Sequence, residues 1–246
     1  MPKLRPRLQR PLQQKNSNSA DTDAIWIVIP AYNEETVIAS VIKEIRQAGY
    51  ENILVVDDGS VDHTFDVARS TGIVTLRHRL NRGKGAATKT GIEAAKLLNA
   101  HIIVTMDGDG QHDPGDISRL VSPILEEQSR VVLGSRLLHP AGMPQYKILH
   151  NYIGNLITWW LFGLYVTDSQ SGFRAYSRHA AELINTRYDR YEYESEVIRE
   201  IHVYGLRFIE IPIAVRYTDY SMGKITKQNL ANGVKTVYKM FLKLLT

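Results

Sequence analysis

The sequence contains no cysteine among its 246 residues. Disulfide bonds and metal sites built on thiolates are therefore excluded, and the composition is consistent with a reducing compartment. The N-terminus also lacks the apolar core of a secretory signal peptide. With 43% hydrophobic and 23% charged residues, the composition is typical of one large domain, or one domain with appendages, that can bury a substantial core.

Two common nucleotide-binding motifs are absent as well. The segment Asn81-Arg-Gly-Lys-Gly85 lacks the spacing of a Walker loop and the Ser or Thr that follows its lysine. The first apolar run is followed by Pro30-Ala-Tyr-Asn-Glu34 instead of a Gly-x-Gly-x-x-Gly turn. A P-loop nucleotidase and a dinucleotide-binding oxidoreductase are both disfavoured by these differences.

The formal net charge of +4 is unevenly placed. Residues 1–15 hold no acid but five basic side chains, namely Lys3, Arg5, Arg7, Arg10 and Lys15. Because this region also lacks apolar periodicity, we predict that residues 1–22 form a disordered basic tail. Such a tail could contact nucleic acid or anionic lipid, but a solvated tail is the simpler interpretation.

Short apolar runs alternate with helical patterns in the first half of the chain. The runs predict strands at residues 25–29, 53–56, 73–76, 102–106 and 131–134. The intervening patterns predict helices at residues 33–48, 64–70, 85–98 and 116–127. Strands and helices in this alternation indicate an α/β fold, with a mostly parallel sheet that carries helices on both faces.

Acidic residues follow several of the expected strands. Glu34 comes after the first strand, Asp57 and Asp58 after the second, and Asp107 and Asp109 after the fourth. Right-handed crossovers place the carboxyl ends of parallel strands at one edge of the sheet. Open α/β sheets bind ligands at this edge, so we expect these acids to converge on a ligand.

Asp107, Asp109 and Gln111 offer oxygen ligands at alternate positions. Such ligands suit Mg2+ or Mn2+, whose remaining positions would go to water or to phosphate oxygens of a substrate. Gly108 allows a ligand to approach the backbone closely. An EF-hand has the same alternation, but this segment lacks its glycine and its final glutamate. Taken alone, the motif could also be a solvated acidic turn.

A series of short motifs supports a more specific assignment. They are Ile29-Pro-Ala-Tyr-Asn-Glu34, Val55-Val-Asp-Asp-Gly-Ser60, Asn81-Arg-Gly-Lys-Gly85, Met106-Asp-Gly-Asp-Gly-Gln-His-Asp-Pro114, Gly134-Ser-Arg136 and Asp168-Ser-Gln-Ser-Gly-Phe-Arg174. In this order they resemble glycosyltransferase family 2, and within it the dolichyl-phosphate mannose synthase branch. The resemblance implies a GT-A fold over residues 23–226, with amphipathic helices on the acceptor side.

The resemblance also implies roles for individual residues. The donor nucleotide would be bound by Pro30, Tyr32, Glu34, Val56, Asp58 and Gly108. The metal ion would be held on the diphosphate by Asp107, Asp109 and Gln111, and the phosphate charge would be neutralised by Lys84, Arg136 and Lys224. The acceptor side would be bordered by Gln170, Ser171 and Arg174. For the three cations, ordinary surface charge is the alternative.

The implied reaction transfers mannose from GDP-mannose to a dolichyl or polyprenyl phosphate, with inversion at the anomeric carbon. The catalytic groups would be Asp107, Asp109 and Arg136, because a metal and an arginine stabilise the departing diphosphate. A lipid phosphate is already ionised and needs no general base, whereas a hydroxyl acceptor on a glycan normally does. Asp168 is the candidate base in that case, and capping of a local turn is its alternative role.

One departure from the family leaves the donor open. The segment Tyr217-Thr-Asp-Tyr-Ser-Met-Gly-Lys224 stands where mannose synthases have a Gly-Glu-Ser-Lys-like run. Donors carrying UDP, with glucose or N-acetylglucosamine, are therefore the alternative. A different class of function is a nucleotide-sugar-binding scaffold without catalysis, which the complete acidic motif disfavours. Nucleic-acid binding is disfavoured by the acidic strand ends.

Two segments predict contact with a membrane. Residues 148–166 are apolar but interrupted by polar positions, and their two tryptophans favour an interface. Residues 227–246 predict a basic amphipathic helix. The alternative for each is a helix docked on the domain. We expect a protein peripheral to the cytoplasmic face of a membrane, or one anchored by a membrane-bound protein partner.

Overall fold

The computed structural model describes residues 24–140, 143–190 and 192–216. The predicted basic tail (1–22), Lys224 and the predicted C-terminal helix (227–246) lie outside the described residues. The predictions made for these segments therefore stay predictions.

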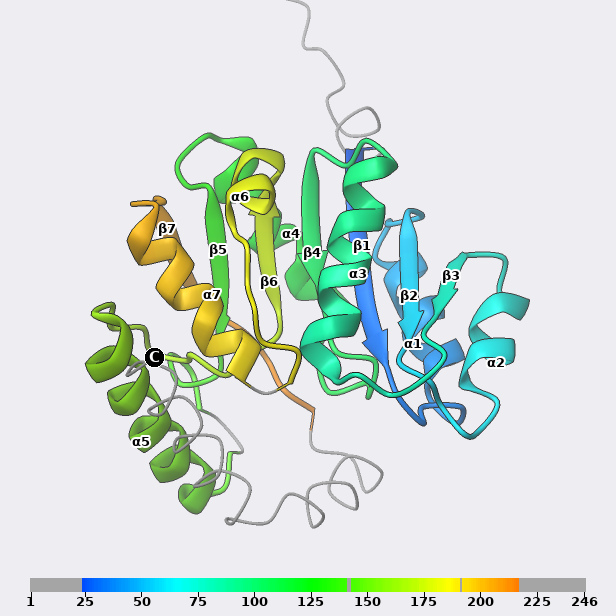
Figure 1. Ribbon diagram of the computed structural model, residues 1–246, viewed down its shortest axis with the longest axis horizontal. Coiled ribbons are helices and arrows are strands. Elements are labelled where there is room, and N and C mark those ends of the chain that lie inside the picture. The colour runs from blue at the N-terminus through cyan, green and yellow to red at the C-terminus, as the bar shows by residue number, and fades with distance from the viewer. Residues whose placement is uncertain (1–23, 141–142, 191, 217–246) are drawn as a thin grey trace, which may run out of the picture.

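A seven-stranded sheet forms the centre of the fold, in the order β3-β2-β1-β4-β6-β5-β7 (Figure 1). The strands are β1 (Ile25–Ala31), β2 (Ile53–Asp57), β3 (Val74–Arg77), β4 (Ile102–Thr105), β5 (Val131–Ser135), β6 (Arg174–Ser177) and β7 (Phe208–Pro212). Neighbouring strands are parallel except at β6, which runs antiparallel to β4 and β5. The predicted mixed α/β fold with a mostly parallel sheet is confirmed.

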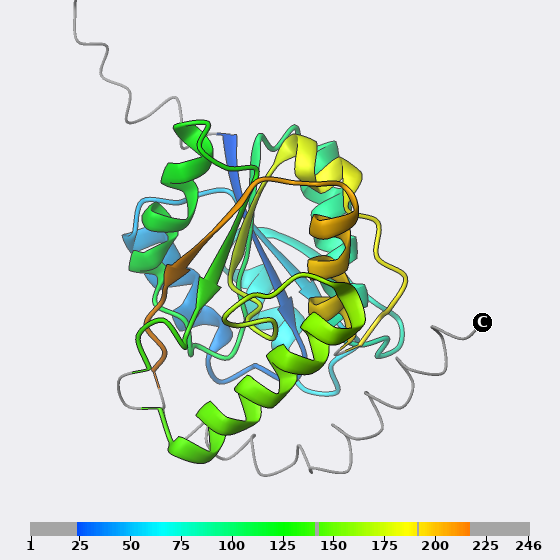
Figure 2. The same cartoon turned by 90° about the vertical axis from the view of Figure 1, so that its left-hand side faces the viewer.

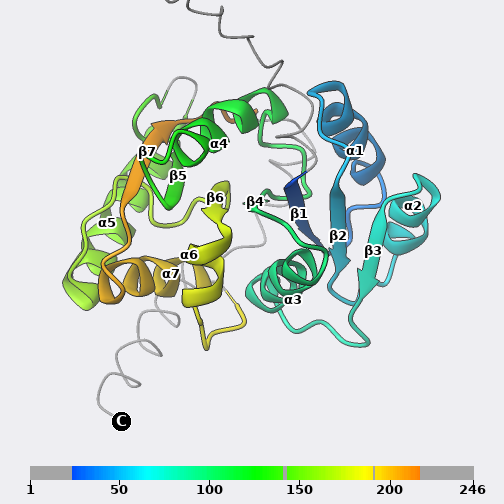
Figure 3. The same ribbon diagram turned by 90° about the horizontal axis from the view of Figure 1, so that it is seen from above.

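Helices cover both faces of this sheet (Figure 3). They are α1 (Ile38–Gln47), α2 (Thr64–Ser70), α3 (Lys84–Leu97), a 3-10 turn η2 (Pro114–Asp116), α4 (Ile117–Leu125), α5 (Gln145–Phe162), α6 (Arg178–Leu183) and α7 (Glu192–Val203). Figure 3 shows α1 and α4 on one face and α3, α6 and α7 on the other. α5 covers neither face, but packs against α7 below the level of the strands in Figure 1.

The central strands are buried on both faces, which explains their continuous apolar runs. In β1, for example, Ile27, Val28 and Ile29 are fully buried. Ile27 and Ile29 belong to the core cluster that includes residues of α1 and α4. Val28 belongs to a second cluster with residues of α3 and α7. The alternation of side chains along one strand thus supplies both core layers.

The first helix begins later than its acidic sequence predicts. Asn33 has a positive φ of 55°, and the chain turns before α1 begins at Ile38. The Glu34 carbonyl accepts hydrogen bonds from the N–H groups of Val37 and Ile38. The predicted acids of the first helical turn therefore precede the helix, and Glu34 is left at the end of β1.

The elements from β6 onward carry little sequence signal. β6 reads Arg-Ala-Tyr-Ser and is completely buried although it contains a charge. α7 buries Glu192, Glu194, Glu196 and Glu200. Buried charged residues interrupt the hydrophobic pattern from which strands and helices are predicted. For this reason β6 and α7 are absent from the sequence-based prediction. The antiparallel β6 is nevertheless important, since it brings Arg174 to the edge where the parallel strands end.

A close contact between α3 and the sheet can be tested. A Cβ added at Gly91 would lie 2.3 Å from Val28 Cγ1 and 3.2 Å from Val56 Cγ2. We expect Gly91→Ala to lower the free energy of unfolding by about 1–2 kcal/mol, because overpacking exceeds the gain in helix propensity. Urea denaturation measures this change.

Gly154→Ala in α5 is the matched control. Its added Cβ would meet Nε2 of Gln170 at 2.4 Å, and this is the movable end of a flexible side chain. The control should therefore match or exceed the wild-type stability. Equal stability of the two variants would contradict the packing proposed for α3.

Candidate active site

The loop after β4 brings two carboxylates to the carboxyl edge of the sheet. Asp107 Oδ1 lies 2.7 Å from Nζ of Lys84, the first residue of α3. The same Nζ lies 2.9 Å from Oε1 of Glu194, in the first turn of α7. On the other side, Nε2 of His112 lies 3.4 Å from Asp107 Oδ2. One ammonium group between two carboxylates thus joins β4, α3 and α7.

The charges in this cluster support one another. Burial opposes the ionised forms of Asp107 and Lys84, but their mutual attraction is stronger. The pKa of Asp107 is therefore far below its usual range, and Asp107 together with Glu194 raises the pKa of Lys84. The pKa of Asp109 is raised instead, because burial and the charge of Asp107 both disfavour its carboxylate. The loop thus carries negative charge that an added cation would neutralise.

The ligand types suit a hard divalent cation that takes further ligands from outside the protein. Asp107 and Asp109 supply carboxylate oxygens, which Mg2+ and Mn2+ prefer. In the part of the chain that the structure describes, no three His, Cys, Asp or Glu side chains are grouped to hold a metal ion. Gln111 is half-buried, and its N–H donates to Asp109 Oδ1 at 3.0 Å. These residues fit a cation completed by water or phosphate oxygens.

Three residues of this site are missing from the sequence-based prediction: His112, Glu194 and Gly172. A Cβ on Gly172 would lie 2.6 Å from Lys84 Nζ and 2.7 Å from Asp107 Oδ1. A larger residue here would therefore have to displace the ends of both side chains and so disturb the ion pair. Both His112 and Gly172 lie inside motifs that the sequence reveals, whereas Glu194 reaches the site only through the packing of α7.

Asp58 supports the loop before α3. Its carboxylate accepts hydrogen bonds from the N–H groups of Arg82 at 3.0 Å and Gly83 at 2.7 Å. His78 Nδ1 lies 2.7 Å from Asp58 Oδ1, and the Asp58 side chain is only 3% exposed. Asp58 thus fixes the start of α3 and with it Lys84, and its predicted contact with the base or ribose stays a prediction.

Pro30, Tyr32 and Glu34 lie where β1 ends. Pro30 lines a small internal cavity together with Lys84 and Asp107. Tyr32 is 43% exposed, whereas Glu34 is buried. The position of these residues beside the Asp107 loop is compatible with the roles predicted for them.

Val56 and Gly108 differ in what they offer. Val56 is fully buried and packs with Leu54 and Ala87 between β2 and α3. Its side chain belongs to the core, as expected for a central strand of a parallel sheet that is buried on both faces, and the predicted contact of Val56 with substrate stays a prediction. At Gly108 a Cβ would lie 3.2 Å from Ile29 Cγ2, so this glycine lets the Asp107 loop pack closely on β1.

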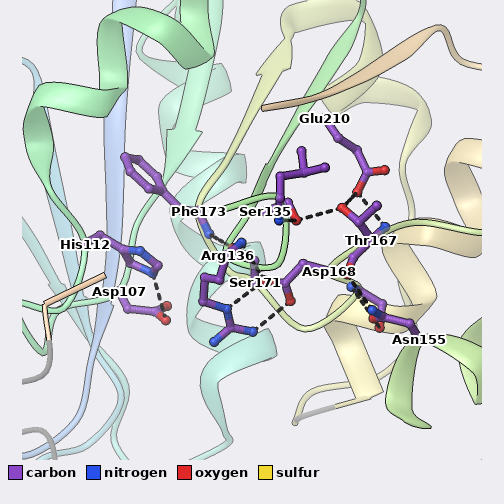
Figure 4. A network of polar contacts seen from close by, with 12 residues as sticks. Asp107, His112, Ser135, Arg136, Asn155, Thr167, Asp168, Ser171, Phe173 and Glu210 are labelled. Atoms are coloured by element: carbon purple, nitrogen blue, oxygen red, sulfur yellow. Dashed lines mark hydrogen bonds and ion pairs between the residues drawn. The ribbon is translucent and has the colours of Figure 1, made fainter. Parts of the chain in front are cut away.

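Arg136 and Asp168 form a bidentate ion pair, shown with Asp107 in Figure 4. Nε and Nη2 of Arg136 lie 2.7 and 2.8 Å from the two carboxylate oxygens, and the Arg136 N–H donates to Oδ2 at 3.0 Å. Burial disfavours the Asp168 carboxylate, but Arg136 outweighs it and the pKa of Asp168 is lowered. A carboxylate with a lowered pKa and both oxygens engaged is poorly suited to act as a general base.

Arg174 lies inside the fold, with 1% of its surface exposed. Its guanidinium donates to the backbone carbonyls of Ser169 and Ser171, each at 2.8 Å, and of Glu194 at 3.1 Å. These donors hold the preceding loop against α7, and the prediction that Arg174 borders the acceptor stays a prediction. Ser171 is also buried, whereas Gln170 is exposed.

α5 turns its apolar side chains outward, which is the reverse of a surface helix in water. Its outer side carries seven large residues that are 48–71% exposed: Tyr146, Leu149, Tyr152, Ile153, Leu156, Trp159 and Trp160. Its buried residues are polar, namely Asn151, Asn155 and Thr158. A core helix would bury the apolar row instead. Figure 2 shows α5 in the foreground, below the strands.

None of the helices that the structure describes is long and apolar enough to cross a bilayer. The first turn of α5 carries a cationic side chain, Lys147. Burial and the charge of Arg136 both lower the pKa of Lys147. Two cationic side chains thus lie near each other on this side of the site, and a nearby anion would stabilise both.

Comparisons with known proteins agree with this geometry. Residues 26–184 match the family model described as Glycosyl transferase family 2. An uncharacterized protein of Methanocaldococcus jannaschii is 42% identical, over 94% of this chain and 96% of its own length. A UDP-N-acetylglucosamine--dolichyl-phosphate N-acetylglucosaminyltransferase of Methanococcus voltae is 37% identical, over 89% of this chain and 95% of its own length. A polyprenol monophosphomannose synthase of Mycolicibacterium smegmatis is 27% identical, over 87% of this chain and 85% of its own length.

Solved structures share the fold at lower identity. Glucosyl-3-phosphoglycerate synthase of Mycobacterium tuberculosis, in complex with uridine diphosphate, superimposes with a TM-score of 0.65. It is 23% identical, and the match covers 90% of this chain and 79% of that chain. At this identity the likeness shows a common fold, the GT-A fold, and confirms the architecture expected from the motifs.

The Arg136–Asp168 pair predicts a pH-dependent contribution to stability. We expect Asp168→Asn to lower the free energy of unfolding by about 3 kcal/mol at neutral pH, because Arg136 loses its partner. The folded-state pKa of Asp168 is depressed, so this stabilisation is present above the unfolded pKa of about 3.9 and is lost as the pH falls through the lower folded value. The free energies of unfolding of variant and wild type, measured in urea, should begin to converge below about pH 4 and become equal only below the folded-state pKa of Asp168.

Asp66→Asn is the control for this experiment. The Asp66 carboxylate is 71% exposed, so its stability should stay within about 0.5 kcal/mol of the wild type. A difference between Asp168→Asn and wild type that stayed constant into acid would contradict the ion pair as its source.

Proposed function

Because the chain belongs to glycosyl transferase family 2, we propose that it transfers a sugar from a nucleotide-diphosphate donor to the phosphate of a polyprenyl or dolichyl lipid. The observation that carries this proposal is the combination of three features at one edge of the sheet. These are the acidic loop at Asp107 and Asp109, the cations Arg136 and Lys147, and the outward apolar face of α5. Relatives named for lipid-phosphate acceptors support it.

The donor would occupy the acidic loop. Asp107, Asp109 and Gln111 would hold Mg2+ or Mn2+, which when bound neutralises charge on the diphosphate that leaves. Lys84 adds a positive charge 2.7 Å from Asp107, held in place by Glu194. These groups are fixed before the reaction, so they can stabilise the developing charge without reorganising. Inversion follows if the acceptor attacks from the face opposite the diphosphate.

The acceptor would approach beside Arg136 and Lys147. An ionised phosphate is a nucleophile that needs no general base, and both cations can attract and orient it. The one carboxylate that the sequence offers as a base, Asp168, is instead engaged by Arg136. This engagement favours a lipid phosphate over a glycan hydroxyl as the acceptor.

The sugar is proposed from the relatives. UDP-N-acetylglucosamine is our first choice of donor. The relative named for this donor is 37% identical, and the match covers 95% of its length. GDP-mannose is the second, and it is supported by the polyprenol monophosphomannose synthase at 27% identity. Incubation with both donors and a polyprenyl phosphate, followed by extraction into organic solvent, decides between them.

The apolar face of α5 is proposed to lie on the membrane surface, on the cytoplasmic side where we expect the protein. A row of seven exposed aromatic and aliphatic side chains, including Trp159 and Trp160, is typical of an interfacial helix. A helix in this position would bring the lipid phosphate to Arg136 and Lys147 without removing the lipid chain from the bilayer.

Asp109→Asn tests the donor site. We expect transfer to fall at least about 100-fold, because the cation that neutralises the departing diphosphate would lose a carboxylate ligand. The free energy of unfolding should not change by more than about 0.5 kcal/mol, since Asp109 is not part of the Lys84 ion pair. Asp66→Asn is the control and should retain full transfer. Wild-type turnover in the Asp109→Asn variant would refute the assignment of the site.

Removal of divalent cations tests the same site in the unmodified protein. We expect EDTA to abolish transfer, and Mn2+ or Mg2+ to restore it. The site offers too few protein ligands to retain a metal ion tightly. Activity that persists after dialysis against EDTA, with metal content checked by mass spectrometry, would contradict a required cation.

Trp160→Glu tests the membrane contact. A charge in place of the 71% exposed Trp160 should reduce co-sedimentation with phospholipid vesicles about tenfold, because a charged side chain does not enter the interface. Leu97→Glu is the matched control, since Leu97 is 84% exposed but lies on α3. Equal vesicle binding by both variants would contradict the role of α5.

A further inference from the structure

The inner face of α5 contains an asparagine that the proposed reaction does not use. Asn155 is 1% exposed and lies on the side opposite the apolar row. Buried amide groups are costly unless they are fully hydrogen-bonded. The partners of Asn155 therefore show what the inner face of this helix is built to hold.

Asn155 binds the residues on both sides of Asp168. Its Nδ2 donates to the backbone carbonyl of Thr167. Its Oδ1 accepts hydrogen bonds from the N–H and the hydroxyl of Ser169, each at 2.9 Å. Figure 4 shows Asn155 reaching from α5 to this segment. One side chain thus fixes the main chain immediately before and immediately after Asp168.

The segment that Asn155 holds is attached to the rest of the fold at its first and its last residue. The Thr167 N–H and hydroxyl both donate to Glu210 of β7 at 2.7 Å. Beyond Asp168, the contacts of Ser169 with Asn155 are joined by Thr158, whose hydroxyl lies 3.3 Å from the Ser169 hydroxyl. The Ser169 carbonyl in turn accepts a hydrogen bond from Arg174 at 2.8 Å. Asn155 and Arg174 thus hold the main chain after Asp168 together, and Asn155 is the one of the two that lies on α5.

Asp168, whose main chain Asn155 holds on both sides, in turn binds Arg136. The Asp168 carboxylate accepts the Arg136 backbone N–H as well as two guanidinium N–H groups. The two residues are 32 positions apart in the sequence, and Arg136 belongs to a different element, the end of β5. The orientation of the Arg136 side chain thus depends on a segment that α5 holds.

We propose that Asn155 is a positioning residue that couples the membrane-facing helix α5 to Arg136 through Asp168. Docking of α5 on lipid would order the helix, and Asn155 would transmit this order to the Thr167–Ser169 segment. Arg136 would then be best oriented when the lipid surface is present. The lipid part of this inference rests on the proposed function, whereas the link from Asn155 to Arg136 does not.

Amide exchange tests the link without any substrate. We expect Asn155→Leu, which keeps the branched shape but replaces both hydrogen-bonding groups with methyl groups, to speed hydrogen–deuterium exchange at the Arg136 N–H at least about tenfold. Thr158→Val is the matched control, because it is on the same buried face but does not touch the backbone beside Asp168. The Arg136 amide should exchange there at the wild-type rate.

Two results would overturn the link. One is faster exchange at Ser169 with unchanged exchange at Arg136 in Asn155→Leu, which would show that Asn155 only holds its immediate neighbours. The other is equal acceleration by Thr158→Val, which would show a general loosening of α5. If Asn155→Leu does not fold, Asn155→Asp replaces it; this variant keeps an acceptor for Ser169 and should give a smaller acceleration at Arg136.

Vesicles and kinetics test the coupling to lipid. In the wild type, vesicles of phosphatidylcholine and phosphatidylglycerol should slow exchange at the Arg136 amide, and in Asn155→Leu they should not, although both proteins bind the vesicles. An Arg136 amide that is indifferent to vesicles in the wild type would overturn this coupling.

Transfer assays complete the test. Asn155→Leu should lower kcat at least about tenfold with the donor KM unchanged, and combining it with Asp168→Asn should cost no more than Asp168→Asn alone, since both act through one pair. Multiplicative losses would overturn a shared route. Absence of transfer by the wild type would refute the proposed function alone, because the exchange experiment still decides whether Asn155 fixes Arg136.

Discussion

The ion pair between Lys84 and Asp107 is the contact on which the donor side of the fold depends. A buried strand delivers Asp107 to a position where its charge is partly removed from water. Such a charge requires a partner, and Lys84 at the start of α3 provides it. Lys84 in turn is shared with Glu194 of α7, while Asp58 fixes the loop that leads into α3. Three helix and strand ends are therefore fixed relative to one another by a single ammonium group.

Much of the fold up to β5 could be predicted from the sequence because its strands are buried on both faces and its helices are amphipathic. The region from β6 to β7 could not, because its interior is stabilised by charges with distant partners. Arg174 illustrates this, since its donors reach three carbonyl oxygens in the loop before it and in α7. Motifs were informative about where the site lies and less so about what each residue touches. Asp58 and Val56 lie in the predicted region, yet one supports a loop and the other packs in the core.

α5 shows a related limit of periodicity. Its sequence predicts an amphipathic helix, but the pattern alone does not say which side faces the protein. Asn155 and Thr158 resolve this, because buried polar residues need partners and the Thr167–Ser169 segment supplies them. The apolar row is then left outside. Polar contacts inside and apolar side chains outside are the arrangement expected where the surroundings are less polar than water.

The loop between α5 and β6 connects the two sides of the site. At its far end Gly172 lies against the Lys84–Asp107 pair, which a larger residue would displace. At its near end Asp168 holds Arg136. The antiparallel direction of β6 is what allows this, because a strand that begins at the carboxyl edge needs a loop that crosses this edge first. A displacement of α5 would therefore act on Arg136 through Asn155 and Asp168 at the near end of this loop, and it would reach the acidic loop only through Gly172 at the far end. Since Asp168 is at the end of the loop next to α5 and Gly172 is at the other end, an interfacial helix would influence the acceptor side more strongly than the donor side.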